Sequence, residues 1–165
     1  MQKRVANIAI SASTLRNQGA AGVVESARKY LSQLSLGIFQ GISTENQFMK
    51  ILDDCTDELM QKMPKGARNW GTARKAINVF LEETLYNGCL NEIYALNNIA
   101  EYFEVPLDNY VAKNLIKEDR NGRLPSWQSI KRLNPETSAI FQSYAREVAN
   151  DKGTIRIYLD LMYWR

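Results

Sequence analysis

Apolar residues recur at helical spacing along most of the chain. A first stripe covers 23–34, after the glycine-containing stretch RNQGAAG. A second begins at Thr44, where the sequence TENQ fits a capping box with Gln47 as the partner of the capping residue. Its apolar members are Phe48, Ile51, Leu52, Cys55 and Leu59. Residues with this spacing share one face of an α-helix, so the pattern predicts a helix over 23–34 and another from Thr44 to just before Pro64.

The middle of the chain predicts three more helices. One follows the segment PKGARNWG and carries apolar residues over 76–81. Gly88 then permits a break before a helix over roughly 90–103. Pro106 has a fixed φ that suits a first turn, so it opens the next helix and places Leu107 and Asp108 in that turn.

The last third of the chain contains one clear helix and one ambiguous segment. In NPETSAIFQSYAREVANDKG, Asn134 is the expected N-cap, Pro135 the first helical residue and Gly153 the C-terminal cap. The final TIRIYLDLMYWR alternates like a strand, but its apolar residues also fit a helix. Because no other segment offers a convincing partner strand, we predict a helix here and an all-α fold, a compact single-domain bundle over 1–165.

Composition and charge are those of an ordinary globular protein. The chain has 165 residues, 45% hydrophobic and 24% charged, with a net charge of +3, which is enough for one sizeable core. Its apolar runs are too short to span a bilayer, and the start MQKRVANIAISAS lacks the apolar length of a secretion signal. We therefore expect a cytoplasmic protein without a membrane partner, and we favour a monomer.

The chain contains no histidine, which limits the chemistry that it can perform. Ser-His-Asp and Cys-His catalysis and the histidine-bearing zinc sites are excluded. Cys55 and Cys89 lie in predicted helices and are expected to be small core residues. We expect neither a metal nor a cofactor, so any enzymatic chemistry would come from Lys, Asp, Glu, Tyr or Ser.

A basic segment without acidic residues lies between Glu58 and Glu82. It contains one tryptophan and five cations, Lys62, Lys65, Arg68, Arg74 and Lys75. A turn that leads into a helix N-terminus presents free N–H groups, and cationic side chains beside them favour a bound phosphate. The alternative interpretation is a solvated lysine-rich loop, since most charge runs lie on the surface.

The order of residues in this segment resembles that of a known family. GTARKAINVF is similar to the hairpin and following helix of the helix-hairpin-helix DNA glycosylases, which read G-V-G-R-K-T-A-N-V-V in thymine-glycol-type members. Gly71 matches the first glycine, and Arg74 and Lys75 match the R-K pair without a gap. Ala73 replaces the second hairpin glycine. The resemblance implies a helix-hairpin-helix motif around 60–85.

A second match lies further along the chain, in VPLDNYVAKNL. It resembles the family segment V-D-x-x-V-x-R, in which an aspartate opens a helix, and Asp108 matches that aspartate. The interval from Lys75 to Asp108 is 108 − 75 = 33 residues. This interval and the extra helix that it accommodates are closest to the archaeal 8-oxoguanine DNA glycosylase branch.

The resemblance implies roles for particular residues. Lys75 would be the nucleophile that attacks the sugar and Asp108 the carboxylate that assists it, in an enzyme that removes a damaged or modified base from DNA and can go on to cleave the strand. Trp127 and Trp164 are candidates for stacking on the extruded base. The candidate DNA-binding residues are Lys65, Arg68, Asn69, Trp70, Gly71, Ala73 and Arg74.

Two other interpretations remain open at this stage. The chain could be a helical DNA-binding or protein-interaction module without catalysis, or its likeness to the glycosylases could be accidental. Asp108 could equally serve only as a helix cap. The catalytic interpretation makes a geometric demand, because Asp108 must come back to meet Lys75.

Overall fold

The structure is a computed structural model that describes residues 1–163 of the chain. Within this range the elements are helices and turns without a strand, which confirms the all-α prediction. The α-helices are α1 (Gln2–Ala9), α2 (Val23–Gln33), α3 (Glu45–Lys62), α4 (Trp70–Tyr86), α5 (Gly88–Tyr94), α6 (Asn109–Glu118), α7 (Pro135–Asp151) and α8 (Leu159–Tyr163). The 3-10 helices are η1 (Leu36–Phe39), η2 (Lys65–Ala67), η3 (Leu96–Tyr102), η4 (Ile130–Arg132) and η5 (Arg156–Tyr158).

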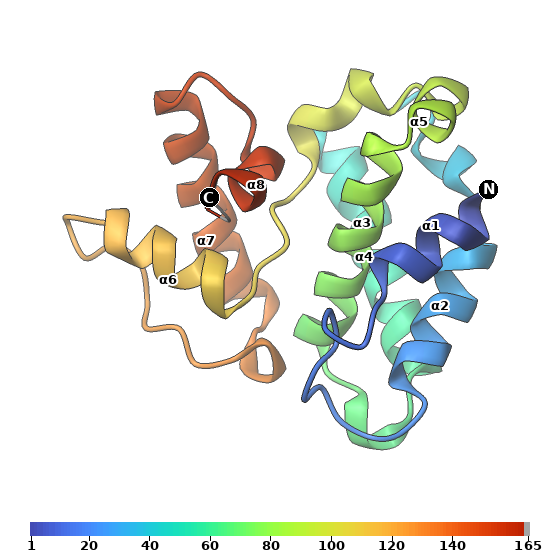
Figure 1. Ribbon diagram of the computed structural model, residues 1–165. Coiled ribbons are helices and arrows are strands. Elements are labelled where there is room, and N and C mark those ends of the chain that lie inside the picture. Colours follow the sequence, from blue (N-terminus) through green and yellow to red (C-terminus); the bar gives the residue numbers. More distant parts are fainter. Residues whose placement is uncertain (164–165) are drawn as a thin grey trace.

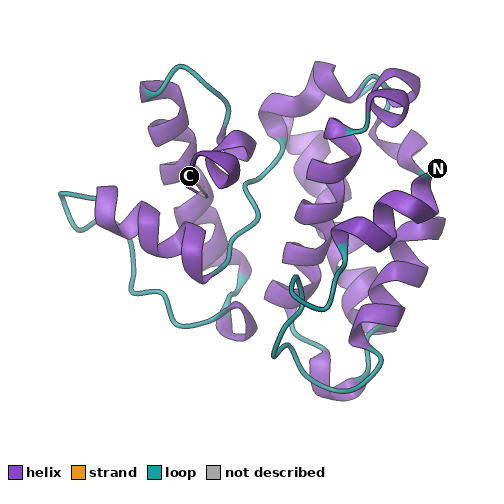
Figure 2. Ribbon diagram, in the orientation of Figure 1, coloured by secondary structure: helices purple, strands orange, loops and turns teal. Residues whose placement is uncertain are grey.

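The helices form two groups that are joined by an extended segment (Figure 1). The first lobe contains α1 to α5, and the second contains α6 to α8. Residues 103–108, here called the linker, cross from one lobe to the other (Figure 2). The buried apolar residues follow the same division into two clusters, whereas the sequence analysis expected one core.

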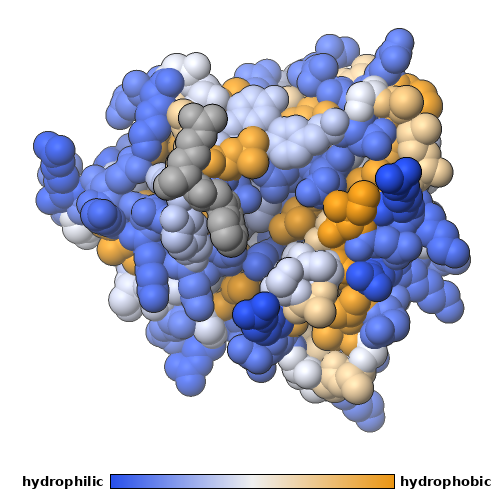
Figure 3. Space-filling model, viewed as in Figure 1, coloured by the Kyte–Doolittle hydropathy of each residue, from blue (hydrophilic) through white to orange (hydrophobic). Residues whose placement is uncertain are grey.

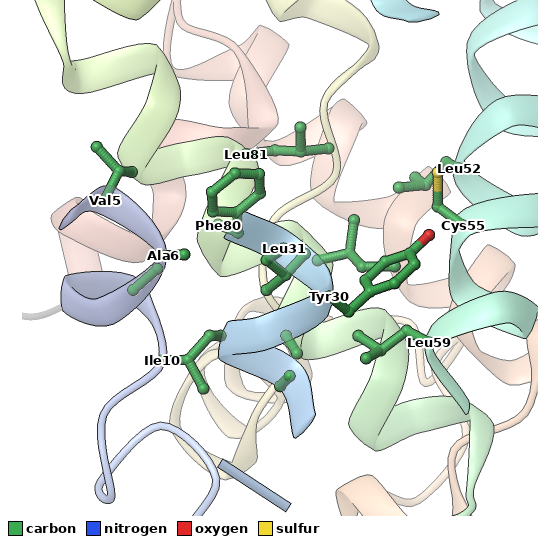
Figure 4. Close-up of a cluster of buried hydrophobic side chains, with 14 of the residues drawn as sticks. Val5, Ala6, Ile10, Tyr30, Leu31, Leu52, Cys55, Leu59, Phe80 and Leu81 are labelled. Carbon is green, nitrogen blue, oxygen red and sulfur yellow. The ribbon is translucent and has the colours of Figure 1, made fainter. Parts of the chain in front are cut away.

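Helix α4 forms the centre of the first lobe, where it contacts α1, α2 and α3. Its apolar residues point into a cluster that Figure 4 shows in part, with Phe80 and Leu81 facing Leu31 of α2 and Leu52 of α3. Phe80, Leu31 and Leu52 are completely buried. Because α4 is covered on several sides, several of its polar residues are buried together with its apolar ones.

Several sequence predictions are confirmed in detail. The Thr44 hydroxyl accepts a hydrogen bond from the Gln47 amide at the start of α3, while the Gln47 side chain accepts from the Ser43 amide. Asn134 caps α7 with Pro135 at its first position. The ambiguous C-terminal segment is helical through Tyr163.

Other predictions are wrong by about a turn. Gly71, expected in a hairpin, lies inside the first turn of α4, because Asn69 accepts from the Thr72 amide and starts the helix earlier. Asp108 is the N-cap of α6 rather than a first-turn residue, and Leu107 precedes the helix. The helix expected over 90–103 is divided at Ala95, which has a φ of 53°. The short amphipathic helix α1 was not predicted.

Gly71 has a packing role that explains its identity. A Cβ at this position would lie 2.0 Å from the Ile130 carbonyl oxygen and 2.8 Å from Leu133 Cβ. The backbone of η4 in the second lobe therefore rests directly on the first turn of α4. Only a glycine permits this approach, which is one of the contacts that hold the lobes together.

We expect Gly71→Ala to destabilise the protein by roughly 2–3 kcal/mol, because the added methyl must push η4 away from α4. Urea unfolding measures the change. Gly88→Ala is the matched control, since a Cβ there meets nothing within 4 Å. Equal stability of the two variants would contradict the packing role.

Candidate active site

The structure brings Lys75 and Asp108 together across the two lobes. Lys75 lies in the second turn of α4, and its Nζ is 3.5 Å from Asp108 Oδ2. Their side chains are 10% and 22% exposed. The pair is thus nearly enclosed but still open to solvent, and the geometric demand of the catalytic interpretation is met.

Asp108 is held by the helix that it caps. Its Oδ1 accepts hydrogen bonds from the Tyr110 and Val111 amides at 2.8 and 3.0 Å. The other carboxylate oxygen remains for Lys75. Capping therefore orients the carboxylate without occupying the oxygen that faces the amine.

The pair lines a cleft of about 410 Å³. Pro106 of the linker and Val79, one turn after Lys75, supply apolar walls. The remaining lining residues are polar and come from the α1–α2 loop and from α8: Ser13, Thr14, Arg16 and Asp160. An amine and a carboxylate in a partly apolar cleft of this size can act on one group of a bound ligand.

Sequence reasoning missed these polar residues of the cleft. The α1–α2 loop shows little in the sequence except Arg16 within a polar and glycine-rich stretch. Asp160 is the single acidic residue of the apolar segment YLDLMY, and this feature could have marked it as a candidate site residue. Their position beside Lys75 depends on tertiary packing, which the local pattern does not contain.

Arg74, which the sequence analysis predicts to bind DNA, is buried and ion-paired in this structure. Its guanidinium is 3% exposed and pairs with Glu104 Oε2 at 2.9 Å and with Asp53 Oδ1 at 2.9 Å. It also donates to the Thr56 hydroxyl and lies over the Trp70 ring. The sequence analysis predicts a DNA contact for Arg74 because it belongs to the basic segment and matches the R-K pair of the motif, but adjacent residues of a helix point in different directions.

The other predicted DNA-binding residues differ in their exposure to solvent. Gly71 and Ala73 are buried inside the first turns of α4. Asn69 caps α4, and Trp70 is partly buried against the second cluster. Lys65 and Arg68 are exposed on η2 and just after it, so of the seven these two are the cations that remain free to meet a phosphate.

Of the two candidate base-stacking tryptophans, the structure describes Trp127, which lies away from the Lys75 cleft. Trp127 packs edge-on against Phe141 with ring centroids 5.6 Å apart, and its Nε1 donates to Asn109 Oδ1. It does not line the Lys75 cleft. Trp164 lies outside the described residues.

Of the two cysteines, Cys55 is buried as expected, but Cys89 is exposed at the start of α5, so its prediction as a core residue is wrong. Residues 1–163 contain no group of three Cys, Asp or Glu side chains placed to hold a metal ion. In the same range no helix combines the length and the apolar character needed to cross a membrane.

No family model matches the chain, and comparisons with curated proteins and with solved structures gave no match. Interpretation of the site therefore depends on its own geometry.

An acidic residue of α4, Glu82, is buried and interacts with Asp160, which lines the cleft. Glu82 is 6% exposed and accepts a hydrogen bond from the Tyr86 hydroxyl. Burial, and next the negative charge of Asp160 on α8, raise the pKa of the Glu82 carboxyl to about 8. Tyr86 also stacks on Tyr158, so this cluster joins the C-terminal segment to α4.

The raised pKa of Glu82 predicts a loss of stability at alkaline pH. The native state holds the proton between about pH 4.5 and pH 8 while the unfolded chain releases it, so the free energy of unfolding falls as pH rises through this window. We expect Glu82→Gln to remove that fall and to stabilise the protein by roughly 2–4 kcal/mol at pH 8.5, with little effect at pH 4.5. Denaturant unfolding at both pH values tests this, and a pH-independent difference would refute it.

Proposed function

We propose that this protein is a DNA glycosylase in which Lys75 displaces a damaged or modified base and Asp108 assists. The observation that carries the proposal is the approach of Lys75 Nζ to Asp108 Oδ2, 3.5 Å apart in a cleft between two lobes. The sequence resemblance implies the same two roles for these residues, which are 33 positions apart in the chain.

In the proposed reaction the uncharged Lys75 amine attacks C1′ of the sugar. The bond from C1′ to the base breaks, and the base leaves with the bonding electrons and takes up a proton. Loss of the amine protons and opening of the sugar ring leave an imine between Lys75 and C1′. In this proposal Asp108 accepts a proton from the amine and stabilises the positive charge that develops on the sugar, and the approach of Lys75 Nζ to Asp108 Oδ2 supports both roles.

A basic surface beside the cleft supports DNA as the partner. Three segments without acidic residues, 11–22, 63–69 and 120–134, meet at the first turn of α4. Gln18 of the first accepts a hydrogen bond from the Thr72 hydroxyl, Gly19 contacts Gly66, and Ile130 rests on Gly71. The exposed cations of these segments that we call the basic collar are Arg16, Lys65, Arg68, Lys131 and Arg132.

The positive charges of the basic collar are not compensated by ion pairs among the described residues. None of its five residues forms a salt bridge within residues 1–163. Two exposed cations of the second lobe are paired instead, Arg123 with Glu147 and Lys152 with Glu118. Hydrophilic residues dominate the face that includes the junction of the lobes (Figure 3). An uncompensated positive collar around a cleft favours a polyanion such as the DNA backbone.

The decisive experiment traps the imine. The protein is incubated with duplexes that carry oxidised or otherwise modified bases, and borohydride is added. We expect a covalent adduct that is lost in Lys75→Ala and formed roughly 100-fold more slowly in Asp108→Asn. Lys113→Ala, which removes an exposed lysine of α6, is the control and should trap normally.

Failure would separate the remaining interpretations. Duplex binding without any adduct would identify a non-catalytic DNA-binding module. Absence of both would leave the sequence resemblance as accidental.

The collar makes a separate prediction for DNA affinity. Lys131→Glu with Arg132→Glu should weaken binding to any duplex, and the slope of log K against log salt should become less steep by about two, because two phosphate contacts are lost. Lys3→Glu with Arg4→Glu changes the same charge on α1 and is the matched control. Equal affinity and slope in both double variants would exclude the collar as the binding surface.

A further inference from the structure

The linker that carries Asp108 is fixed by buried polar side chains from both lobes. From the first lobe, Arg74 and Asn78 of α4 donate to the Glu104 carboxylate at 2.9 and 2.8 Å. From the second lobe, the Gln142 side chain of α7 bonds Val105 on both sides. Its Nε2 donates to the Val105 carbonyl and its Oε1 accepts from the Val105 amide.

A further buried side chain holds the start of the linker. Arg156 of η5 donates to the Tyr102 and Phe103 carbonyls at 2.7 and 2.8 Å. All the side chains that hold the linker are almost fully buried, between 2% and 4% exposed: Arg74, Asn78, Gln142 and Arg156, here called the linker clamp. Four consecutive residues, 102–105, are thus fixed immediately before Pro106, Leu107 and Asp108.

We propose that the linker clamp is a positioning device that sets the distance between Asp108 and Lys75. The proposal rests on the proposed function of those two residues. Its physical basis is that Arg74 and Lys75 are consecutive on α4, while Glu104 and Asp108 are four residues apart on the linker. The buried pair Arg74–Glu104 and the partly exposed pair Lys75–Asp108 therefore both join α4 to the linker. A displacement of one pair changes the geometry of the other.

The hydrogen bonds of the linker clamp fix the orientation of the linker more than they add to the attraction between the lobes. Apolar contacts between the lobes are non-directional, whereas a carboxylate bonded by two donors and an amide bonded through both of its atoms fix orientation. Pro106 removes further freedom because its φ is fixed. Only Pro106 and Leu107 separate Asp108 from the last clamped residue, Val105, which leaves Asp108 little room to move away from Lys75.

Two variants that weaken the linker clamp test the proposal, because they separate an effect on the trapping rate from an effect on duplex affinity. Gln142→Met removes both bonds to Val105, and Glu104→Gln weakens the bond from Arg74. Each is expected to lower the rate of borohydride trapping at saturating duplex by roughly tenfold to a hundredfold, with duplex affinity unchanged. A purely structural role would leave the trapping rate of the folded protein at the wild-type value.

Thr84→Val is the matched control. It removes a buried hydrogen bond from the same helix α4, where the Thr84 hydroxyl donates to the Leu81 carbonyl, but it does not touch the linker. Its trapping rate at saturating duplex should stay within about twofold of the wild type. If Glu104→Gln does not fold, Gln142→Met alone decides. Wild-type trapping in the clamp variants that bind duplex would overturn the proposal.

A failure of the proposed function is distinguishable from a failure of the clamp. If the wild-type protein traps no substrate, the clamp is tested by crystal structures of Gln142→Met and the wild type. The clamp requires Lys75 Nζ and Asp108 Oδ2 to separate beyond hydrogen-bonding distance in the variant. An unchanged separation of about 3.5 Å would overturn it.

Discussion

The buried charge of Arg74 is the constraint on which the relative arrangement of the two lobes depends. A guanidinium that is 3% exposed is very unfavourable unless carboxylates compensate it. Asp53 supplies one of them from α3, but the fully enclosed one is Glu104, which belongs to the linker. Separation of the linker from α4 would leave a charge buried without its partner. The position of the linker against α4 is thus set by electrostatics. Because Asp108 is the last residue of the linker, its position is set in the same way.

Charged and amide side chains gather where the lobes meet, while the interior of each lobe is mainly apolar. Glu104, Gln142 and Arg156 are buried at this junction together with Arg74. Two apolar clusters alone would hold the lobes with little preference for one angle, since hydrophobic contact has no direction. The hydrogen bonds across the junction supply that preference. This division of roles explains how a chain of this size presents a cleft between lobes and not a single filled core.

The sequence predicted the helices well where local chemistry determines them. Periodic apolar residues located α2 and α3, and side-chain capping located the starts of α3 and α7 at Thr44 and Asn134. The errors lie where tertiary contacts override local pattern. Gly71 suggested a turn, yet the close approach of Ile130 requires a glycine within a helix. Arg74 suggested a surface contact, although Glu104, a lone acid among Phe103, Val105 and Pro106, was a sign that a buried partner was needed.

The residues that match the family motif differ in how far this fold alone explains them. Gly71 and Arg74 have sufficient structural reasons in this fold, because one admits the backbone of η4 and the other compensates Glu104. Their match to the motif is therefore no independent support for a phosphate grip. Lys75 and Asp108 differ in this respect. Capping of α6 uses Oδ1 alone, and neither side chain is fully buried. Capping does not use the remaining oxygen of Asp108, which lies opposite Lys75, so the proposed chemistry rests on this pair.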